Sequence, residues 1–420
     1  MVLLAINTTI VTTGIVVFLI VILILVGILL FAKAKLTAKG DVKISINNGD
    51  RVITTEPGSS LLSTLAGQKI FLPSACGGKG SCGMCKCQVD SGAGSILPTE
   101  TGFFSYKQQH ENWRLACQVK VKENIEMRIP ESVMGIKKWE CTVVSNRNIS
   151  TFLKEFVVKL PEGENLKFKS GGYIQIDVPA LDVDFKDMII DEKYKGDWEK
   201  MKMFDLKMHN PEPTYRAYSM ANSPAEGNII MLNIRIATPP FDRAAGAFAP
   251  VNICSSFIFS RKPGDKVTIS GPYGEFFLRE TNNEMMFIGG GAGMAPMRSH
   301  IFNLFHTMHT DRKVTFWYGA RALQEAPYVD EFNKIQEENP NFHWTLALDR
   351  PDPVADAAGV AYKPGFVHQV IFENYLKNHE NPEDIEYYLC GPPMMIQAVT
   401  KMLYDLGVPD ENVMYDNFGG

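Results

Sequence analysis

The sequence predicts a chain of several domains: an N-terminal transmembrane helix, a small cysteine-rich α+β domain, an antiparallel β-barrel and a doubly wound α/β domain. Three observations predict this fold class. An uncharged apolar segment begins the chain, short β-type segments follow a glycine-rich cysteine loop, and the last third alternates strand-type and helix-type segments. At 420 residues the chain is long for one domain, and about two to four domains are expected.

Residues 1–36 are predicted to form a membrane anchor. The first charged residue is Lys33, and the segment from Gly14 to Ala32 is almost entirely aliphatic. About 20 apolar residues span a bilayer as a helix, whereas a cleaved signal peptide has a basic start and a shorter apolar core. Lysines follow the segment and none precedes it, so the positive-inside rule places the remaining domains in the cytoplasm. A buried helix of a soluble domain is the alternative.

The composition excludes one class of partner and one class of scaffold. The net charge is −5 and basic residues dominate no long stretch, so nucleic-acid binding has no electrostatic support. The eight cysteines do not imply a disulfide framework, because the cytoplasm keeps thiols reduced.

Residues 37–131 are predicted to form the cysteine-rich domain. Two short strands flank an Asn-Asn-Gly turn within residues 42–66, and a helix-like stretch follows. Further strands are expected at 86–92 and over 113–130, the latter with Cys117 near its start.

The cysteine loop within this domain predicts an iron–sulfur cluster. Cys76, Cys82 and Cys85 follow the pattern C-x5-C-x2-C, and Cys117 lies 32 residues further on. Plant-type [2Fe–2S] proteins use C-x4-C-x2-C and a distant fourth cysteine, and the intervening glycines allow the close backbone approach that a cluster needs. We therefore expect these four cysteines to be the metal ligands and Cys87 to be a packed neighbour.

Two other cysteine chemistries remain as alternatives. A zinc ribbon normally has two C-x2-C pairs, and this loop contains one. A thioredoxin-type pair at Cys82 and Cys85 requires a βαβ context, which the surrounding pattern lacks.

Residues 136–281 are predicted to form the β-barrel. Many short β-type segments are separated by Gly, Pro and Asn, a spacing that favours an antiparallel barrel. An insertion at 182–210 is rich in Asp, Glu and Lys. We expect this insertion to be solvated, helical in part and without a catalytic role.

Residues 282–420 are predicted to form the doubly wound α/β domain. Strand-type segments at 284–290, 313–320, 342–349 and 386–391 alternate with helix-type segments at 295–309, 327–340, 367–379 and 392–407. Such alternation implies a parallel sheet with helices on both faces.

Arg216 to Asn222 read RAYSMAN and suit flavin binding. An arginine can form forked bonds to a pyrophosphate, Tyr218 offers an aromatic face for an isoalloxazine ring, and Ser219 can hydrogen-bond the flavin edge where hydride arrives. The segment resembles the R-x-Y-S signature of the ferredoxin-NAD(P) reductase family, and a strand without a ligand is the alternative. The resemblance implies FAD, held by Arg216, Ala217, Tyr218 and Ser219, and by Ser255 and Ser256 of the segment CSSF.

GGGAGMAP at residues 289–296 suits a second pyrophosphate. A close glycine turn between a strand and a helix presents such a group to the helix N-terminus, and proline fits the first helical turn. Resemblance to the same family implies that NADH binds here and at two further segments, YGAR and CGPP. The residues expected to hold it are Gly289, Gly290, Gly291, Gly293, Pro296, Arg321, Gly391 and Pro392. By the same resemblance, Cys390 shapes the hydride path and is not a nucleophile; an ordinary buried thiol is the alternative.

The whole chain resembles one family, the F subunits of Na⁺-translocating NADH:quinone oxidoreductases. The resemblance includes the anchor, the insertion before RAYSMAN and the terminal DNFGG. It implies a β-grasp ferredoxin domain, FAD, one [2Fe–2S] cluster, NADH as electron donor and partner membrane subunits in the bacterial inner membrane. It also implies that Phe418 covers the flavin and acts with Tyr218, Ser219 and Cys390 at the catalytic centre.

Two other functions remain as alternatives. One is a membrane-anchored NADH reductase that feeds an oxygenase or desaturase. The other belongs to a different class, a membrane-tethered zinc-binding scaffold.

Overall fold

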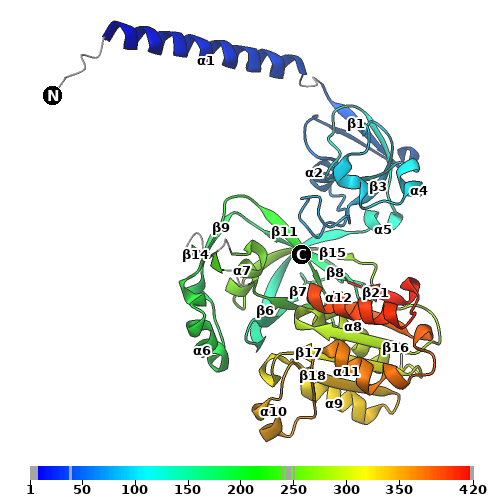
Figure 1. The fold of residues 1–420 in the computed structure, drawn as a ribbon. Coiled ribbons are helices and arrows are strands. Elements are labelled where there is room, and N and C mark those ends of the chain that lie inside the picture. The colour runs from blue at the N-terminus through cyan, green and yellow to red at the C-terminus, as the bar shows by residue number, and fades with distance from the viewer. Residues whose placement is uncertain (1–7, 37–39, 238–240, 243–246, 249–250, 417–420) are drawn as a thin grey trace, which may run out of the picture. The chain divides into compact units, whose positions relative to one another are not determined.

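The computed structural model describes residues 8–36, 40–237, 241–242, 247–248 and 251–416 (Figure 1). Contacts divide the chain into two compact units. The first contains Met1–Leu72 with Cys85–Val133, and the second contains Pro73–Met84 with Met134–Gly420.

The chain begins with helix α1, Thr8–Leu36. Between Gly14 and Gly27 the helix contains only Ile, Val, Leu and one Phe. When the described residues are searched, no helix proves both long and apolar enough to be assigned as a membrane span.

The first unit contains a five-stranded sheet in the order β2-β1-β5-β3-β4. β1 and β2 form the expected antiparallel hairpin, in which Asn47 and Asn48 adopt positive φ. β5 pairs parallel to β1 in the centre, and α2 begins at Ser60, whose hydroxyl accepts from the Ser63 N–H. The elements are β1 Val42–Ile46, β2 Arg51–Thr55, α2 Leu61–Gly67, β3 Lys86–Ser91, α3 Pro98–Thr101, α4 Tyr106–His110, β4 Trp113–Leu115, β5 Ile125–Arg128 and α5 Glu131–Met134.

Residues 113–130 differ from the expected single strand. They form β4 and β5, which pair with β3 on opposite sides. The chain must therefore leave one side of β3 and cross to the other, and it turns at residues 116–118 to do so. This turn places Cys117 outside the regular hydrogen-bond ladder.

The second unit contains the predicted antiparallel barrel. Its sheet has the order β11-β8-β15-β6-β7-β12, and every neighbouring pair is antiparallel. A bridge between Met220 and Leu232 joins the two ends and closes the barrel. The elements are β6 Lys137–Ser150, β7 Leu153–Lys159, β8 Tyr173–Val178, β11 Thr214–Ser219, β12 Ile229–Arg235, β13 Phe241–Asp242, β14 Ala247–Phe248, α7 Ile253–Ser260 and β15 Lys266–Tyr273.

The insertion before β11 is helical in part, as predicted, but it is not simply a solvated loop. It consists of β9 Leu181–Asp184, η2 Phe185–Asp187, α6 Glu192–Lys200, η3 Met203–Asp205 and β10 Lys207–Asn210. Its apolar residues Phe185, Trp198 and Met203 are buried against the barrel core. Most residues of α6 are charged, which is why the composition suggests a solvated loop. The buried residues of this helix are Tyr194 and Trp198.

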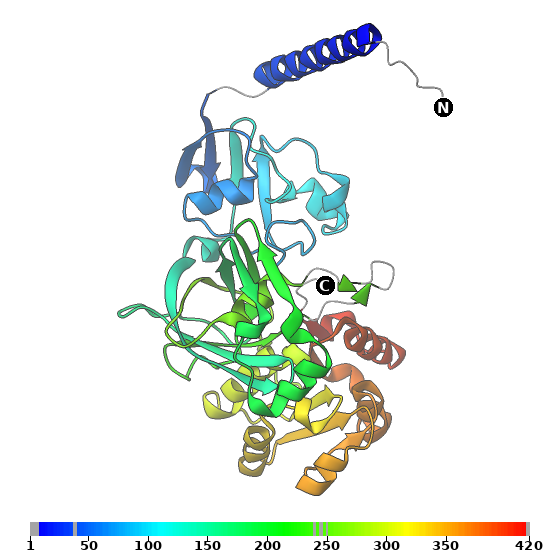
Figure 2. The same ribbon diagram turned by 90° about the vertical axis from the view of Figure 1, so that its left-hand side faces the viewer.

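The rest of the second unit is the predicted doubly wound domain (Figures 1 and 2). Its sheet has the order β19-β18-β17-β16-β20-β21, and all pairs are parallel. The strands are β16 Met285–Gly290, β17 Val314–Ala320, β18 Phe342–Leu348, β19 Lys363–Pro364, β20 Glu386–Cys390 and β21 Val413–Tyr415. The helices are α8 Met294–His306, α9 Val329–Glu338, α10 Pro353–Ala358, α11 Val367–Asn374 and α12 Pro393–Asp405.

Alternate residues of β16 face two separate hydrophobic cores. Met285 and Phe287 pack with residues of α8 and α9, whereas Met286 and Ile288 pack with residues of α11 and α12. Because both faces of the central strands are covered, β16 is apolar along its whole length. The strand order reverses between β16 and β20, and ligands bind at the carboxyl ends of strands at such a point.

Candidate functional site

The predicted flavin segment lies on β11, which pairs with β8. The side chains alternate, so that Ala217 and Ser219 are buried while Arg216 and Tyr218 are half-buried on the other face. Arg216 Nη1 donates to the carbonyls of Tyr215 at 2.8 Å and Cys76 at 3.1 Å. Burial raises the pKa of the Tyr218 hydroxyl well above its usual value, so the hydroxyl stays neutral.

The start of α7 lies against this strand. Burial raises the pKa of Cys254 to about 11, and the nearby charge of Arg216 opposes that rise. Asn252 caps the helix, with its side chain accepting from the Ser255 N–H at 3.1 Å and its carbonyl accepting from the Ser256 hydroxyl at 2.5 Å. The structure therefore brings the predicted serines close to the RAYS strand, but the Ser256 hydroxyl is engaged in capping.

The two predicted nicotinamide motifs meet at the reversal of strand order. Gly289 at the end of β16 pairs in register with Cys390 at the end of β20. A Cβ atom on Gly293 would lie 1.9 Å from the Cys390 carbonyl oxygen, so only glycine fits there. A Cβ atom on Gly391 would lie 2.5 Å from Met395 Cε and 3.1 Å from the Gly290 carbonyl oxygen. The two motifs are therefore packed backbone against backbone.

The remaining predicted nicotinamide residues surround the same edge. Gly291 adopts φ 55° with open space beside its Cα, and its carbonyl accepts from the Tyr318 hydroxyl at 3.0 Å. Pro296 lies in the first turn of α8, and Pro392 immediately precedes α12. Arg321 is exposed just beyond the end of β17.

Sequence reasoning missed Asp416, which joins the two halves of this centre. The Ser219 hydroxyl donates to Asp416 Oδ2 at 2.7 Å, and the Asp416 N–H donates to the Leu389 carbonyl at 3.0 Å. Burial raises the pKa of Asp416 to about 7, with the Ser219 hydroxyl opposing the rise. Burial and the nearby Asp416 also raise the pKa of the Cys390 thiol well above its usual value. β11 and β20 are thus joined through one residue, Asp416, whose carboxylate accepts from Ser219 and whose backbone N–H donates to Leu389.

The tail that follows Asp416 contains one further predicted residue. Phe418, expected to cover the flavin, lies outside the described residues. The sequence contains one signal that could have identified Asp416 as a site residue. It is the only acidic residue of the Asp-Asn-Phe-Gly-Gly tail, and it directly follows the short strand β21.

The cysteines of the loop are held as two pairs. The Cys82 thiol donates to Cys76 Sγ at 3.4 Å and lowers the pKa of Cys76, and backbone hydrogen bonds from residues 80–82 act in the same direction. Hydrogen bonding to Cys117 and burial together raise the pKa of Cys85. Across the described ranges, no group of three or more His, Cys, Asp or Glu side chains is already arranged around a metal position.

The loop itself fits a thiolate-bound cluster in its local chemistry. Gly77, Gly78, Gly80 and Gly83 all have positive φ, between 67° and 80°. The backbone N–H groups of residues 80–82 hydrogen-bond the sulfur of Cys76. A Cβ on Gly77 would lie 2.6 Å from Arg216 Nη1. Backbone donors of this kind stabilise anionic sulfur.

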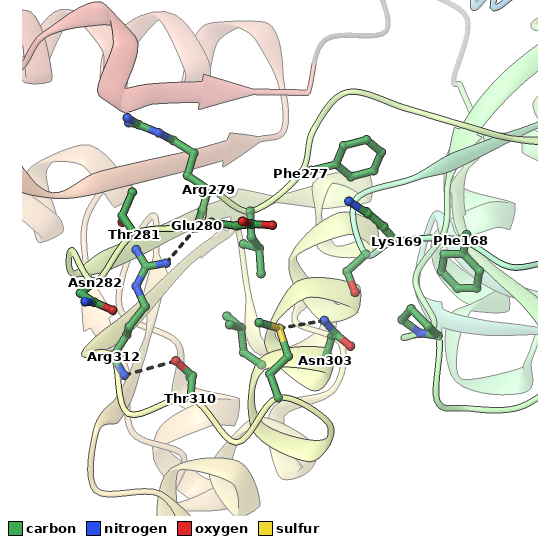
Figure 3. A pocket seen from close by; sticks show the side chains of 15 residues that line it. Phe168, Lys169, Phe277, Arg279, Glu280, Thr281, Asn282, Asn303, Thr310 and Arg312 are labelled. Carbon is green, nitrogen blue, oxygen red and sulfur yellow. Dashed lines mark hydrogen bonds between the residues drawn. The ribbon is translucent and has the colours of Figure 1, made fainter. Parts of the chain in front are cut away.

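The lining of a cavity of about 670 Å³ includes none of the residues of this centre (Figure 3). Part of its lining comes from segments that precede β16 and β17, at the amino ends of the parallel strands, and part comes from residues 168–170 before β8, from Pro224 and from α8. The two arginines in its wall are already engaged: Arg279 bonds to Asn412 Oδ1 at 2.7 Å, and Arg312 bonds to Glu386 at 2.7 Å. We assign these arginines a structural role.

Family models match two parts of the chain. The model described as "2Fe-2S iron-sulfur cluster binding domain" matches residues 44–122, and the one described as "Oxidoreductase NAD-binding domain" matches residues 287–401.

Relatives of high identity cover nearly the whole chain, and each is named as the F subunit of a Na(+)-translocating NADH-quinone reductase. The protein from Idiomarina loihiensis is 53% identical over 408 residues, covering 97% of this chain and 98% of the relative. The protein from Methylococcus capsulatus is 53% identical over 407 residues, with the same coverage. The protein from Pseudomonas aeruginosa is 52% identical over 396 residues, covering 94% and 95%.

Solved structures share the fold. A cytochrome P450 reductase of Amycolatopsis is 24% identical with a TM-score of 0.61, covering 90% of this chain and 98% of that one. A ferredoxin reductase in carbazole 1,9a-dioxygenase is 25% identical with a TM-score of 0.57 and the same coverage.

Proposed function

Because this chain belongs to the family of F subunits of Na⁺-translocating NADH-quinone reductases, we propose that electrons from NADH enter the enzyme at the centre formed by Ser219, Asp416 and Cys390. The chain is an NADH-oxidising subunit that uses FAD and a [2Fe–2S] cluster. FAD, when bound, accepts two electrons as hydride and releases them singly. The hydrogen bond of 2.7 Å between Ser219 and Asp416 carries the proposal, since it joins the flavin strand to the end of the nicotinamide sheet.

The residues of this centre are assigned separate tasks. Arg216 and the start of α7 hold the pyrophosphate of FAD, Ala217 lines the strand beside it, and Tyr218 packs its ring against the flavin. The Ser219 hydroxyl orients the flavin edge, and Asp416 fixes that hydroxyl. Cys390 closes the nicotinamide side with a thiol that stays protonated.

The glycine turn holds the other substrate. Gly289, Gly290, Gly291, Gly293 and Pro296 present the N-terminus of α8 to the pyrophosphate of NADH. Gly391 and Pro392 are assigned to the nicotinamide side of the centre, next to Cys390, where a side chain on Gly391 would displace Met395. Arg321, exposed beyond β17, is assigned to the adenine ribose.

Cys76, Cys82, Cys85 and Cys117 are assigned as the ligands of the [2Fe–2S] cluster. Support comes from their spacing, from the positive-φ glycines of the loop and from the family model over residues 44–122. Cys87 is fully buried and donates weakly to the Arg114 carbonyl at 3.8 Å. It is assigned as a packed neighbour.

Residues 1–36 are assigned as a single-pass anchor in the bacterial inner membrane, with the other domains in the cytoplasm. The apolar side chains from Ile15 to Val26 are between 38% and 68% exposed. This part of α1 is therefore not buried against any other described residues. A helix of 29 residues is about 43 Å long, enough for a bilayer core of about 30 Å. Sodium passage is assigned to partner membrane subunits, because the uncharged segment offers no ion path.

The domain boundaries proposed here are 1–36 for the anchor, 37–131 for the ferredoxin-type domain, 136–281 for the FAD barrel with its insertion at 182–210, and 282–420 for the NADH-binding domain. They are supported by the matched ranges 44–122 and 287–401, which lie inside the second and fourth of these.

Stopped-flow reduction of bound FAD tests the proposed centre. Ser219→Ala removes the hydroxyl that links flavin and carboxyl, and we expect reduction by NADH to slow by about tenfold or more. Reduction by dithionite, which needs no nicotinamide, serves as the control and should keep its rate. If Ser219→Ala and Cys390→Ala are both reduced by NADH at the wild-type rate, electrons do not enter at this centre.

A further inference from the structure

Arg298 on α8 is a buried arginine to which the proposed function assigns no task. It is 5% exposed, and its two terminal nitrogens bind both carboxylate oxygens of Glu226 at 2.9 and 2.8 Å. Arg298 Nη1 also donates to the Ala221 carbonyl at 3.0 Å, and the neighbouring Ser299 hydroxyl donates to the Asn222 carbonyl at 2.8 Å. These bonds tie the second turn of α8 to the segment that directly follows β11.

Tyr328 makes a second connection of the same kind. Its hydroxyl donates to Glu155 on β7 at 2.7 Å and accepts from the Asn233 side chain on β12 at 2.8 Å. The residue precedes α9 and adopts a left-handed backbone, with φ 62°. Such a conformation is strained for a non-glycine residue and persists only where surrounding contacts determine it.

The two connections share one charged centre. The Arg298 guanidinium carbon lies 3.9 Å from the ring centroid of Phe302 and 5.1 Å from that of Tyr328, and Glu331 on α9 approaches Arg298 Nε at 3.4 Å. Glu155 is paired in turn with Arg147 at 2.8 Å. We call the set Arg298, Glu226, Glu331, Tyr328 and Glu155 the Arg298 cluster.

The cluster is a poor device for stability alone. Burying ions costs desolvation energy that their mutual attraction often fails to recover, and burial raises the pKa of Glu331 despite the neighbouring Arg298. What the cluster does provide is geometry. It fastens α8 and α9 of one domain to β7, β12 and the end of β11 of the other, and both domains belong to the same compact unit.

The two fastened segments are those that carry the substrates in the proposed function. Arg298 lies five residues after Gly293 of the glycine turn, and Ala221 lies two residues after Ser219. Hydride transfer requires reacting atoms about 3–3.5 Å apart, and a misplacement of about 1 Å can cost two orders of magnitude in rate. We propose that Arg298 is a positioning residue for hydride transfer, which sets the approach of the nicotinamide to the flavin by holding α8 and α9 against the barrel.

Stopped-flow reduction of FAD in the full chain, by NADH and by NADH dideuterated at the nicotinamide C4, tests this inference. Tyr328→Phe removes the hydrogen bonds to Glu155 and Asn233 but keeps the ring. Arg298→Lys keeps the charge but cannot form the paired hydrogen bonds to both carboxylate oxygens of Glu226. We expect the limiting rate to fall by about tenfold or more with a changed deuterium isotope effect, while the apparent NADH dissociation constant stays within about threefold. FAD and cluster absorbance should be unchanged.

Arg312→Lys is the matched control. Arg312 forms a comparably buried pair with Glu386 at 2.7 Å, but its side-chain bonds go to residues 279, 283 and 386, none of which lies on a strand of the barrel. This variant should keep both the limiting rate and the isotope effect. An equal loss in Arg312→Lys would reduce the cluster to a general contribution to stability and overturn the inference.

Two further outcomes keep the inference open to refutation. If Arg298→Lys fails to fold, Tyr328→Phe and Glu226→Gln decide, since each leaves the arginine in place. A limiting rate within twofold of wild type in both would overturn it. The inference rests on the proposed function, but the two fail differently. Failure of the proposed centre would show as a wild-type rate in both Ser219→Ala and Cys390→Ala, whatever the cluster variants do.

Discussion

Asp416 is the carboxylic acid at this centre, and its surroundings shift its pKa into the neutral range. Burial raises its pKa to about 7, whereas a carboxyl group in an unfolded chain has a pKa of about 3.9. The folded state therefore holds a proton that the unfolded state has already released over the intervening pH range. Asp416 contributes stability that is fully present below about pH 4 and is lost as the pH rises through 7.

Asp416→Asn should remove this dependence, because the amide is neutral at every pH. We expect the drop in the wild-type thermal midpoint between pH 6 and pH 8 to be smaller in the variant, measured by calorimetry on the FAD-loaded chain. Asp405→Asn is the control, since Asp405 pairs with Lys401 at the surface of α12. An identical drop in Asp416→Asn and wild type would contradict the assignment.

Single substitutions should also distinguish Cys87 from the four cysteines assigned as cluster ligands. Burial raises the pKa of Cys87 to about 12, and its sulfur donates only to the Arg114 carbonyl among the described residues. We expect Cys87→Ala to keep the paramagnetic signal of the reduced cluster, while Cys76→Ala, Cys82→Ala, Cys85→Ala and Cys117→Ala each abolish it. Electron paramagnetic resonance after anaerobic reduction decides. Loss of the signal in Cys87→Ala, with retention in any of the other four, would exchange the roles.

At the scale of elements, the sequence is most informative where one period governs a whole segment. The doubly wound sheet is recognisable from its alternation because β16 is apolar throughout, β17 is mostly apolar, and each is followed by turn residues. The segment 113–130 resembles a single strand in sequence, because the turn at 116–118 is imposed by pairing with β3 and leaves no local mark. The insertion is predicted to be solvated because it is rich in charged residues and its few apolar residues are dispersed along the sequence. Their packing against the barrel core is visible only in the folded chain.

Trp198 is expected to anchor the insertion on the barrel. It is fully buried, stacks near Phe259 with centroids 6.0 Å apart, and donates from its indole to the Thr151 carbonyl at 2.7 Å. Trp198→Ala should lower the free energy of unfolding by about 3–5 kcal/mol, measured by urea unfolding followed by flavin fluorescence. Met201→Ala, at a 44% exposed position of the same insertion, should change it little. If both variants changed the free energy of unfolding equally little, Trp198 would not anchor the insertion on the barrel.

In the glycine turn, one substitution is expected to abolish most of the activity. Gly293→Ala places a Cβ 1.9 Å from the Cys390 carbonyl oxygen, so the two strand ends must separate. We expect NADH-dependent reduction of FAD to fall by about two orders of magnitude, with FAD and cluster contents maintained. Gly196→Ala, on α6 with open space around it, should leave the rate unchanged. A normal rate in Gly293→Ala would show that the turn does not hold the substrate.

For the whole molecule, the sequence predicts the modules but not how they meet. The family matches confirm the cluster, the cofactors and NADH. Asp416 and the Arg298 cluster escape prediction because their contacts join residues far apart in the chain, such as Ser219 with Asp416, separated by 197 positions. No short motif records such a pair, and an arginine or aspartate in isolation is usually a surface residue.

Deleting residues 1–36 tests the modular organisation. All the residues assigned to cofactors lie beyond Lys39, so the truncated chain should be soluble and oxidise NADH with ferricyanide at a rate close to that of the full chain in detergent. Absorbance of FAD and cluster should be retained. A truncated chain that keeps both cofactors and does not oxidise NADH would show that the anchor contributes to the redox site.

The edges of the parallel sheet have a consequence for the behaviour of the chain among its neighbours. An unpaired strand edge is a template for another molecule, and such contacts seed aggregates. Here β19 consists of Lys363 and Pro364 alone, and β21 of three residues. Pro364 has no N–H to offer, and a lysine repels a second copy of itself. The sheet thus presents little at its sides to which another strand could add, while its carboxyl ends carry the proposed NADH site.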